Sequence, residues 1–201
     1  VINITENAPT DYAIHVNAHA LARYAALCQE QDIVPIVEPE VLMDGDHDLT
    51  RSFEVTQHAQ QTVFAALADQ AVDLRGIVLK PSMVVSGADA ADRAGIKEVA
   101  QQTLRCLLST VPAAVPGIAF LSGGQSDEEA TQHLNTMNEI GGSLPWAVTF
   151  SYGRALQAAA MKRWAGHSDN VESARQVAFH RAQMNGAAAL GQYSSEMEKA
   201  A

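Results

Sequence analysis

A single lysine stands where an apolar segment ends and a proline follows. This is Lys80, in the stretch RGIVLKPSM at residues 75–83. An isolated ammonium group is costly to bury, so Lys80 either extends its side chain to water or is partly desolvated for a purpose. Partial desolvation disfavours the charged form, and a neutral amine can attack a carbonyl and form a Schiff base. The other lysines, Lys97, Lys162 and Lys199, lie in helical or tail segments among charged neighbours, as solvated lysines do.

Two glutamates follow a second apolar segment. Glu38 and Glu40 come directly after IVPIV, residues 33–37, with Pro39 between them. Residues two apart in an extended chain point to the same side, so both carboxylates can face one site unless Pro39 bends the chain. A carboxylic acid beside an amine can protonate the departing hydroxyl of a carbinolamine and later take a proton back. The alternative is a pair of solvated or helix-capping glutamates.

Small residues connect a strand to a helix in the stretches FLSGGQSDEE and FSYGRALQ. Glycines let backbone N–H groups approach an anion, and the N-terminus of the following helix favours negative charge. Arg154 adds a forked cation suited to phosphate oxygens. We therefore predict a phosphate site here, the alternative being ordinary tight turns with a surface arginine. No Gly-Lys-Ser/Thr follows either loop, so a Walker-type nucleotide site is not supported.

Two patterns resemble metal sites and fail on inspection. The aspartates of residues 44–48 open like a calcium loop, but Leu49 stands where glycine is required and Val55 where a glutamate is required. We interpret this stretch as a polar loop and helix N-cap. His15 and His19 are one helical turn apart without a third ligand, which assigns them to a helix surface. We predict neither a metal nor a cofactor.

Short apolar segments alternate with longer amphipathic segments along the chain. Strands are expected at 33–37, 76–79, 117–121 and 146–150, with 1–4 as a possible fifth. Helices are expected at about 10–30, 48–70, 91–109, 126–139, 153–165 and 170–190. Repeated βα units of this kind build a parallel sheet, either open or closed into a barrel.

Polar side chains follow every expected strand, and this pattern favours a barrel. The strand ends of a barrel converge on one mouth, whereas an open sheet spreads them along a line. We predict an α/β fold, a (β/α)8 TIM barrel, with residues 1–201 as a single domain supplying roughly the C-terminal half. Eight βα units need about 250 residues, so we expect upstream strands to be absent from this sequence. Half a barrel exposes unpaired strand edges, and we expect the natural protein to be longer.

Composition narrows the class of protein. Hydrophobic residues make up 47% of the 201 residues, enough for a sizeable core, and the net charge is -10 with only 13 Lys and Arg residues. This balance argues against nucleic-acid and anionic-membrane partners. No uncharged apolar run approaches the ~18 residues of a membrane span, and the N-terminus has no basic start. Cys28 and Cys106 are expected to be reduced and mostly buried, so we predict a cytoplasmic protein.

Four long motifs resemble one known family. The stretches VPIVEPEVLMDGDHD, GIVLKPSM, PGIAFLSGGQSDEEA and WAVTFSYGRALQ are similar, in order and in register, to the class I, metal-independent fructose-bisphosphate aldolases. The resemblance implies that Lys80 forms the Schiff base with the substrate ketone. It makes Glu38 the acid and base that assists this step, with Glu40 close to it. By the same resemblance, the C1 phosphate is held by Ser122, Gly123, Gly153 and Arg154.

The resemblance also implies a reaction. It is the reversible cleavage of fructose 1,6-bisphosphate to dihydroxyacetone phosphate and glyceraldehyde 3-phosphate, a lyase activity of glycolysis and gluconeogenesis, in a homotetramer without a cofactor. The family's active-site aspartate, two further lysines and an arginine come from earlier strands, upstream of Val1. The family's long tail ending in tyrosine has no match in the final SSEMEKAA. The alternative is a catalytically silent fragment or scaffold that keeps a phosphate pocket and an oligomer surface.

Overall fold

Four parallel strands form one sheet in the computed structural model, which describes residues 1–200. The sheet order follows the chain, β1-β2-β3-β4, and every neighbouring pair is parallel. A helix follows each strand before the next begins, which is the arrangement of a β/α barrel. The strands are β1 (Ile36–Val37), β2 (Val78–Leu79), β3 (Gly117–Phe120) and β4 (Ala147–Phe150).

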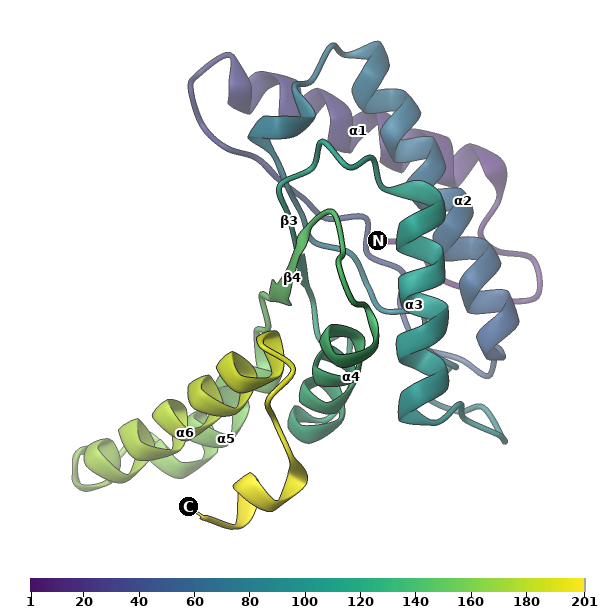
Figure 1. The fold of residues 1–201 in the computed structure, drawn as a ribbon. Helices are drawn as coiled ribbons and strands as arrows, with labels where there is room; N and C mark the ends of the chain where they lie inside the picture. Colours follow the sequence, from purple (N-terminus) through teal and green to yellow (C-terminus); the bar gives the residue numbers. More distant parts are fainter. Residues whose placement is uncertain (201) are drawn as a thin grey trace.

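Long helices make up most of the remaining structure, together with short 3-10 turns (Figure 1). The helices are α1 (Asp11–Gln29), α2 (Leu49–Asp69), α3 (Ile96–Thr110), α4 (Asp127–Ile140), α5 (Arg154–Trp164) and α6 (Val171–Ala189). The 3-10 turns are η1 (Leu74–Gly76), η2 (Ser168–Asn170) and η3 (Ser195–Ala200). None of the helices in residues 1–200 combines the length and hydrophobicity that crossing a lipid bilayer requires.

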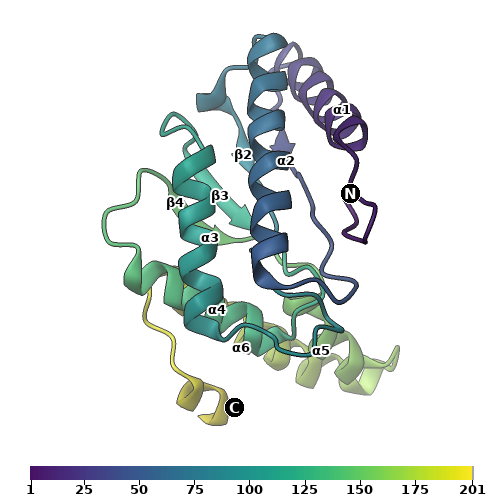
Figure 2. The ribbon, with the colours of Figure 1, turned by 90° about the vertical axis from the view of Figure 1, so that its right-hand side faces the viewer.

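In the described residues, 1–200, the helices cover one face of the sheet and leave the other uncovered. Figure 2 shows α2 and α3 in front of the strands, and Figure 1 shows nothing packed against the opposite side of β3. Val37, Leu79 and Ile118 are each 0% exposed and belong to the main core, whereas Ile36, next to Val37, is 47% exposed. Side chains alternate between the faces of a strand, so on each strand the residues next to these core positions lie on the uncovered face. In a closed barrel this face would line the interior.

Local signals explain where several helices begin. Ser126 and Glu129 form a capping box at the start of α4, as the spacing of their residue types predicts. Asp48 caps α2 by accepting a hydrogen bond from the Arg51 N–H at 2.7 Å, which agrees with the interpretation of residues 44–48 as a loop and N-cap.

Several expected elements differ from the structure, including the strand expected at 76–79, which begins at Val78. The helix expected from residue 91 begins at Ile96, because the preceding residues form a loop in which the Ser86 hydroxyl accepts a hydrogen bond from the Ala94 N–H at 3.1 Å. The segment 33–37 is a strand only at its last two residues, Ile36 and Val37, which pair with Val78 and Leu79. The possible fifth strand at 1–4 is a single parallel bridge between Ile2 and Val41.

The C-terminal segment is tied to α6 and α4 by a charged network. Arg181 donates to Glu198 at 2.6 Å and to the Thr131 hydroxyl at 2.6 Å, and His180 contacts Glu198 at 2.9 Å. Burial alone would raise the pKa of Glu198, but the hydrogen bonds from Arg181 and His180 outweigh it and lower that pKa. The ionised carboxylate therefore holds η3 against the last helix.

Candidate active site

Lys80 and Glu38 meet at the carboxyl ends of β2 and β1. Val37 pairs with Leu79 in register, and the Lys80 N–H donates to the Val37 carbonyl at 2.8 Å. The residues that follow this pair, Glu38 and Lys80, therefore lie side by side. Because they follow the buried residues Val37 and Leu79, both side chains lie on the uncovered face. The Lys80 Nζ is 3.0 Å from the Glu38 Oε1, with the two side chains 21% and 38% exposed. The amine therefore contacts a carboxylate, and both groups remain open to a substrate.

This pair has the parts that Schiff-base chemistry requires. A carboxylate in contact with an ammonium group is well placed to take its proton and free the amine for attack. The same carboxyl group can then return the proton to a departing hydroxyl. The contact is direct, at hydrogen-bonding distance, so the proton has no solvent gap to cross.

Glu40 is placed differently from Glu38. The chain turns tightly at Pro39, where the Glu40 N–H donates to the Glu38 carbonyl at 3.0 Å. Both glutamates are half-buried and line a cavity of about 50 Å³ beside Val1. Within residues 1–200, the carboxylate that pairs with Lys80 is that of Glu38. The bend at Pro39 thus lets Glu38 contact Lys80 while both glutamates line the same cavity.

The first glycine loop is a tight turn at the end of β3. The Gln125 N–H donates to the Ser122 carbonyl at 3.0 Å, and Gly123 and Gly124 occupy the left-handed region with φ of +57° and +91°. Only glycine adopts this conformation without strain, which explains the Gly-Gly pair. In the described part of the chain, the N–H groups of Gly123 and Gly124 have no protein acceptor. They are free to bind an anion.

The second glycine loop lies at the end of the neighbouring strand. Phe120 pairs with Phe150, so the turn after β3 and residues 151–153 after β4 follow adjacent strands. Gly153 is the N-cap of α5 without a side-chain cap, which leaves N–H groups of the first helical turn for another acceptor. The Arg154 side chain is exposed and has no ion pair with any other residue of 1–200. The sequence-predicted phosphate residues therefore lie together at one sheet edge.

Two residues that sequence reasoning missed lie beneath the first loop. Gln125 Oε1 is 2.6 Å from His133 Nδ1, and Gln125 Nε2 donates to the Ser122 carbonyl at 2.9 Å. Burial lowers the pKa of His133 to about 4. The sequence signal was weak, because a lone histidine on an amphipathic helix does not reveal which loop its ring meets.

The acidic and histidine side chains do not form a metal-binding cluster in the described part of the chain. In residues 1–200, no three His, Cys, Asp or Glu side chains gather closely enough to hold an ion. His15 and His19 are exposed on α1, as predicted for a helix surface.

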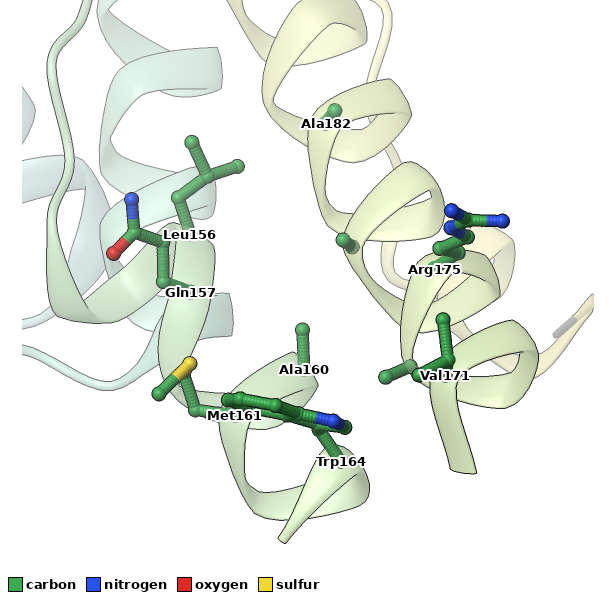
Figure 3. Close-up of a pocket in the computed structure, with 10 residues that line it drawn as sticks. Leu156, Gln157, Ala160, Met161, Trp164, Val171, Arg175 and Ala182 are labelled. Carbon is green, nitrogen blue, oxygen red and sulfur yellow. The ribbon is translucent and has the colours of Figure 1, made fainter. Parts of the chain in front are cut away.

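An apolar groove lies away from these residues. A groove of about 560 Å³ runs between α5 and α6, lined largely by apolar side chains such as Leu156, Met161, Trp164 and Val171 (Figure 3). Among residues 1–200, its lining includes one charged residue, Arg175, and no pair of groups for acid–base chemistry. We therefore place the candidate site at the strand ends and not in this groove.

Parallel strands with helices on one face and an amine–carboxylate pair at their carboxyl ends define part of an α/β barrel protein. The family described as Glycolytic: Fructose-bisphosphate aldolase class-I matches residues 1–201. The chain belongs to the class-I fructose-bisphosphate aldolase family.

Individual relatives agree with this assignment. The chain is 55% identical over 194 residues to a probable fructose-bisphosphate aldolase class 1 of Xanthomonas campestris, covering 96% of this chain and 58% of that protein. It is 48% identical to the cytosolic fructose-bisphosphate aldolase 4 of Arabidopsis thaliana, covering 98% of this chain and 50% of that one. The chain thus spans little more than half the length of these relatives.

A solved structure gives the fold of a relative. The fructose-bisphosphate aldolase of Plasmodium falciparum, in complex with TRAP and a small-molecule inhibitor, superposes with a TM-score of 0.94 at 46% identity. The match covers 96% of this chain and 56% of that one. The prediction of an α/β fold that forms part of a barrel is confirmed.

Proposed function

We propose that the protein carrying this chain is a Schiff-base aldolase that reversibly cleaves fructose 1,6-bisphosphate to dihydroxyacetone phosphate and glyceraldehyde 3-phosphate. The observation that carries the proposal is the 3.0 Å contact between Lys80 Nζ and Glu38 Oε1 on the uncovered face of the sheet. The names of the relatives from Xanthomonas and Arabidopsis support the same reaction class. The two glycine loops support a phosphorylated substrate.

Binding begins with the phosphate in this proposal. The free N–H groups of the Ser122–Gly124 turn and of the Gly153 helix start bind the C1 phosphate, and Arg154 closes on its oxygens. These groups follow β3 and β4, whereas Lys80 follows β2, so the phosphate anchors the sugar while its ketone reaches the amine. Anchoring one end of the substrate in this way makes the attack effectively intramolecular.

Schiff-base formation uses the Lys80–Glu38 pair. Glu38 takes a proton from the Lys80 ammonium, and the freed amine attacks C2 of the ketose. The resulting carbinolamine loses its hydroxyl as water with a proton from the Glu38 carboxyl group. The product is a protonated imine on Lys80. Glu40, in the same cavity as Glu38, keeps the local charge negative while the cationic imine forms.

Carbon–carbon cleavage follows from the imine. The C4 hydroxyl gives its proton to the active-site aspartate that the family resemblance places upstream of Val1, the C3–C4 bond breaks, and its electron pair moves into the protonated imine to form an enamine. Glyceraldehyde 3-phosphate leaves as the aldehyde product. Protonation of the enamine at C3 and hydrolysis of the imine then release dihydroxyacetone phosphate and regenerate Lys80.

We also propose a cytoplasmic homotetramer for the whole protein. The compartment follows relatives that are named cytosolic in Arabidopsis thaliana and cytoplasmic in Pisum sativum. The tetramer rests on the family resemblance of the motifs.

The test uses the full-length natural protein and a coupled assay of fructose 1,6-bisphosphate cleavage. We expect cleavage to persist in excess EDTA and to be lost irreversibly when borohydride is added with dihydroxyacetone phosphate, because reduction fixes the imine on the enzyme. Activity that requires a divalent metal, or that survives borohydride, would contradict the proposal. A protein without cleavage that still binds the sugar phosphate would instead favour a silent scaffold.

A further inference from the structure

A buried amide and imidazole lie beneath the glycine turn after β3. Gln125 is 7% exposed and His133, on α4, is 1% exposed. Burying two polar side chains is costly unless they make hydrogen bonds. The proposed reaction assigns no role to either residue.

The hydrogen-bond directions in this cluster can be assigned from the chemistry of the groups. The Ser122 carbonyl can only accept, so the Gln125 nitrogen faces it, at 2.9 Å, and the same nitrogen is 3.7 Å from the Met83 sulfur. The amide oxygen of Gln125 therefore faces His133. Because that oxygen can only accept, His133 carries its proton on Nδ1 and is neutral.

The remaining ring nitrogen supports this assignment. His133 Nε2 is buried and has no hydrogen-bond partner among residues 1–200. A second proton there would be buried without an acceptor. The neutral ring is thus a fixed donor to Gln125.

These hydrogen bonds fix the orientation of the peptide unit between Ser122 and Gly123. The Ser122 carbonyl receives two hydrogen bonds, from the Gln125 backbone N–H at 3.0 Å and from its side chain at 2.9 Å. In a planar trans peptide, this carbonyl and the Gly123 N–H point in opposite directions. Fixing the carbonyl therefore aims the Gly123 N–H away from the protein's own acceptors.

We propose that Gln125 and His133 are positioning residues that hold the Ser122–Gly124 turn in the shape that binds the substrate's phosphate, an inference that rests on the proposed function. His133 fixes the orientation of the Gln125 amide, and Gln125 fixes the Ser122 carbonyl. Both glycines of the turn have positive φ and no side chains of their own, so the turn depends on this support from below.

The test traps the Schiff base in the full-length natural protein by borohydride reduction with two probes, dihydroxyacetone phosphate and unphosphorylated dihydroxyacetone. Gln125→Met keeps the length of the side chain and removes the amide. We expect it to raise the concentration of dihydroxyacetone phosphate that gives half-maximal trapping about tenfold. Trapping by dihydroxyacetone should stay at the wild-type level, because Lys80 and Glu38 follow other strands.

Variants of His133 sharpen the test. His133→Leu should also raise the concentration of dihydroxyacetone phosphate that gives half-maximal trapping, but by a smaller factor. The Gln125 amide remains in this variant but is free to turn. His133→Asn can donate an amide N–H near the position of Nδ1 and should restore the wild-type value. As a matched control, Thr131→Val alters a fully buried hydroxyl on the same helix that bonds Asn185 at 2.7 Å. This variant should lower thermal stability and leave the half-maximal trapping concentration of both probes unchanged.

Unchanged half-saturation in folded Gln125→Met and His133→Leu, or equal losses with both probes, would overturn the positioning role. If one of these two variants does not fold, the other decides the question. A wild-type protein that neither probe can trap would overturn the proposed function, and this inference with it.

Discussion

The candidate site has two parts, one at the carboxyl ends of β1 and β2 and the other at the carboxyl ends of β3 and β4. The two parts use different chemical groups. In the proposed mechanism, the chemistry at the β1–β2 end uses two partly exposed side chains, Lys80 and Glu38, that contact each other directly. At the β3–β4 end, the proposed phosphate site uses backbone N–H groups of a glycine turn that contacts buried side chains. Proton transfer and covalent attack need side chains that can move, whereas an anion is held best by dipoles that are already fixed. The comparison predicts that changes at the first end alter kcat and that changes at the second alter KM.

The largest effect is expected from Lys80→Met in the full-length protein. It removes the amine while keeping a side chain of similar length, so imine formation becomes impossible and kcat should fall by about a thousandfold or more. Steady-state cleavage of fructose 1,6-bisphosphate measures this. Lys162→Met, which changes an exposed lysine of α5, is the matched control and should retain wild-type kcat. Wild-type turnover by Lys80→Met would end the comparison at once.

Glu38→Gln should have the next largest effect. The amide keeps the shape of the carboxyl group and cannot transfer a proton, so kcat should fall about a hundredfold with little change in KM. The same steady-state assay separates the two constants, and Glu30→Gln at the exposed end of α1 serves as the control. A rise in KM alone would mean that Glu38 belongs to substrate binding.

Arg154→Met should affect the other constant. Losing one charge-assisted contact to the phosphate should raise KM for fructose 1,6-bisphosphate by about tenfold or more, and kcat should change less. Arg163→Met, at the far end of the same helix, is the matched control. If kcat fell and KM stayed constant, the division between the two ends of the edge would be wrong.

The effect that lies furthest from catalysis concerns stability and pH. Burial lowers the pKa of His133 from 6.5 to about 4, so between these values the unfolded chain binds more protons than the folded one. The contribution of neutral His133 is complete above pH 6.5 and is lost as the pH falls through about 4. It amounts to at most about 3 kcal/mol in the free energy of unfolding. Denaturant unfolding at a series of pH values, at one protein concentration, should show this component in the wild type and not in His133→Asn. Identical pH profiles would contradict it.

The sequence could predict what depends on local pattern. The helix starts at Asp48 and Ser126 follow from capping residues, and the parallel sheet follows from the alternation of apolar and amphipathic segments. Lys80 could be singled out as a candidate because a lysine that ends an apolar strand is unusual. The placement of Glu38 beside it depends on the register of β1 against β2, which the chain order of the strands made a reasonable expectation.

What the sequence could not predict depends on distant packing. Strands β1 and β2 pair over only two residues, so the apolar segments overstate their length. The turn at Pro39 decides which glutamate reaches Lys80, and a residue pattern cannot specify that bend. The Gln125–His133 contact depends on which face of α4 is turned toward the loop after β3, so no local sequence motif predicts it.

The central claim is that Lys80 is the amine that forms the imine. The most direct measurement is peptide mass mapping of the full-length protein after borohydride reduction with dihydroxyacetone phosphate. We predict one modified peptide, carrying the reduced adduct on Lys80, and no adduct on Lys97, Lys162 or Lys199. An adduct on another lysine with Lys80 unmodified, or no adduct at all, would contradict the account.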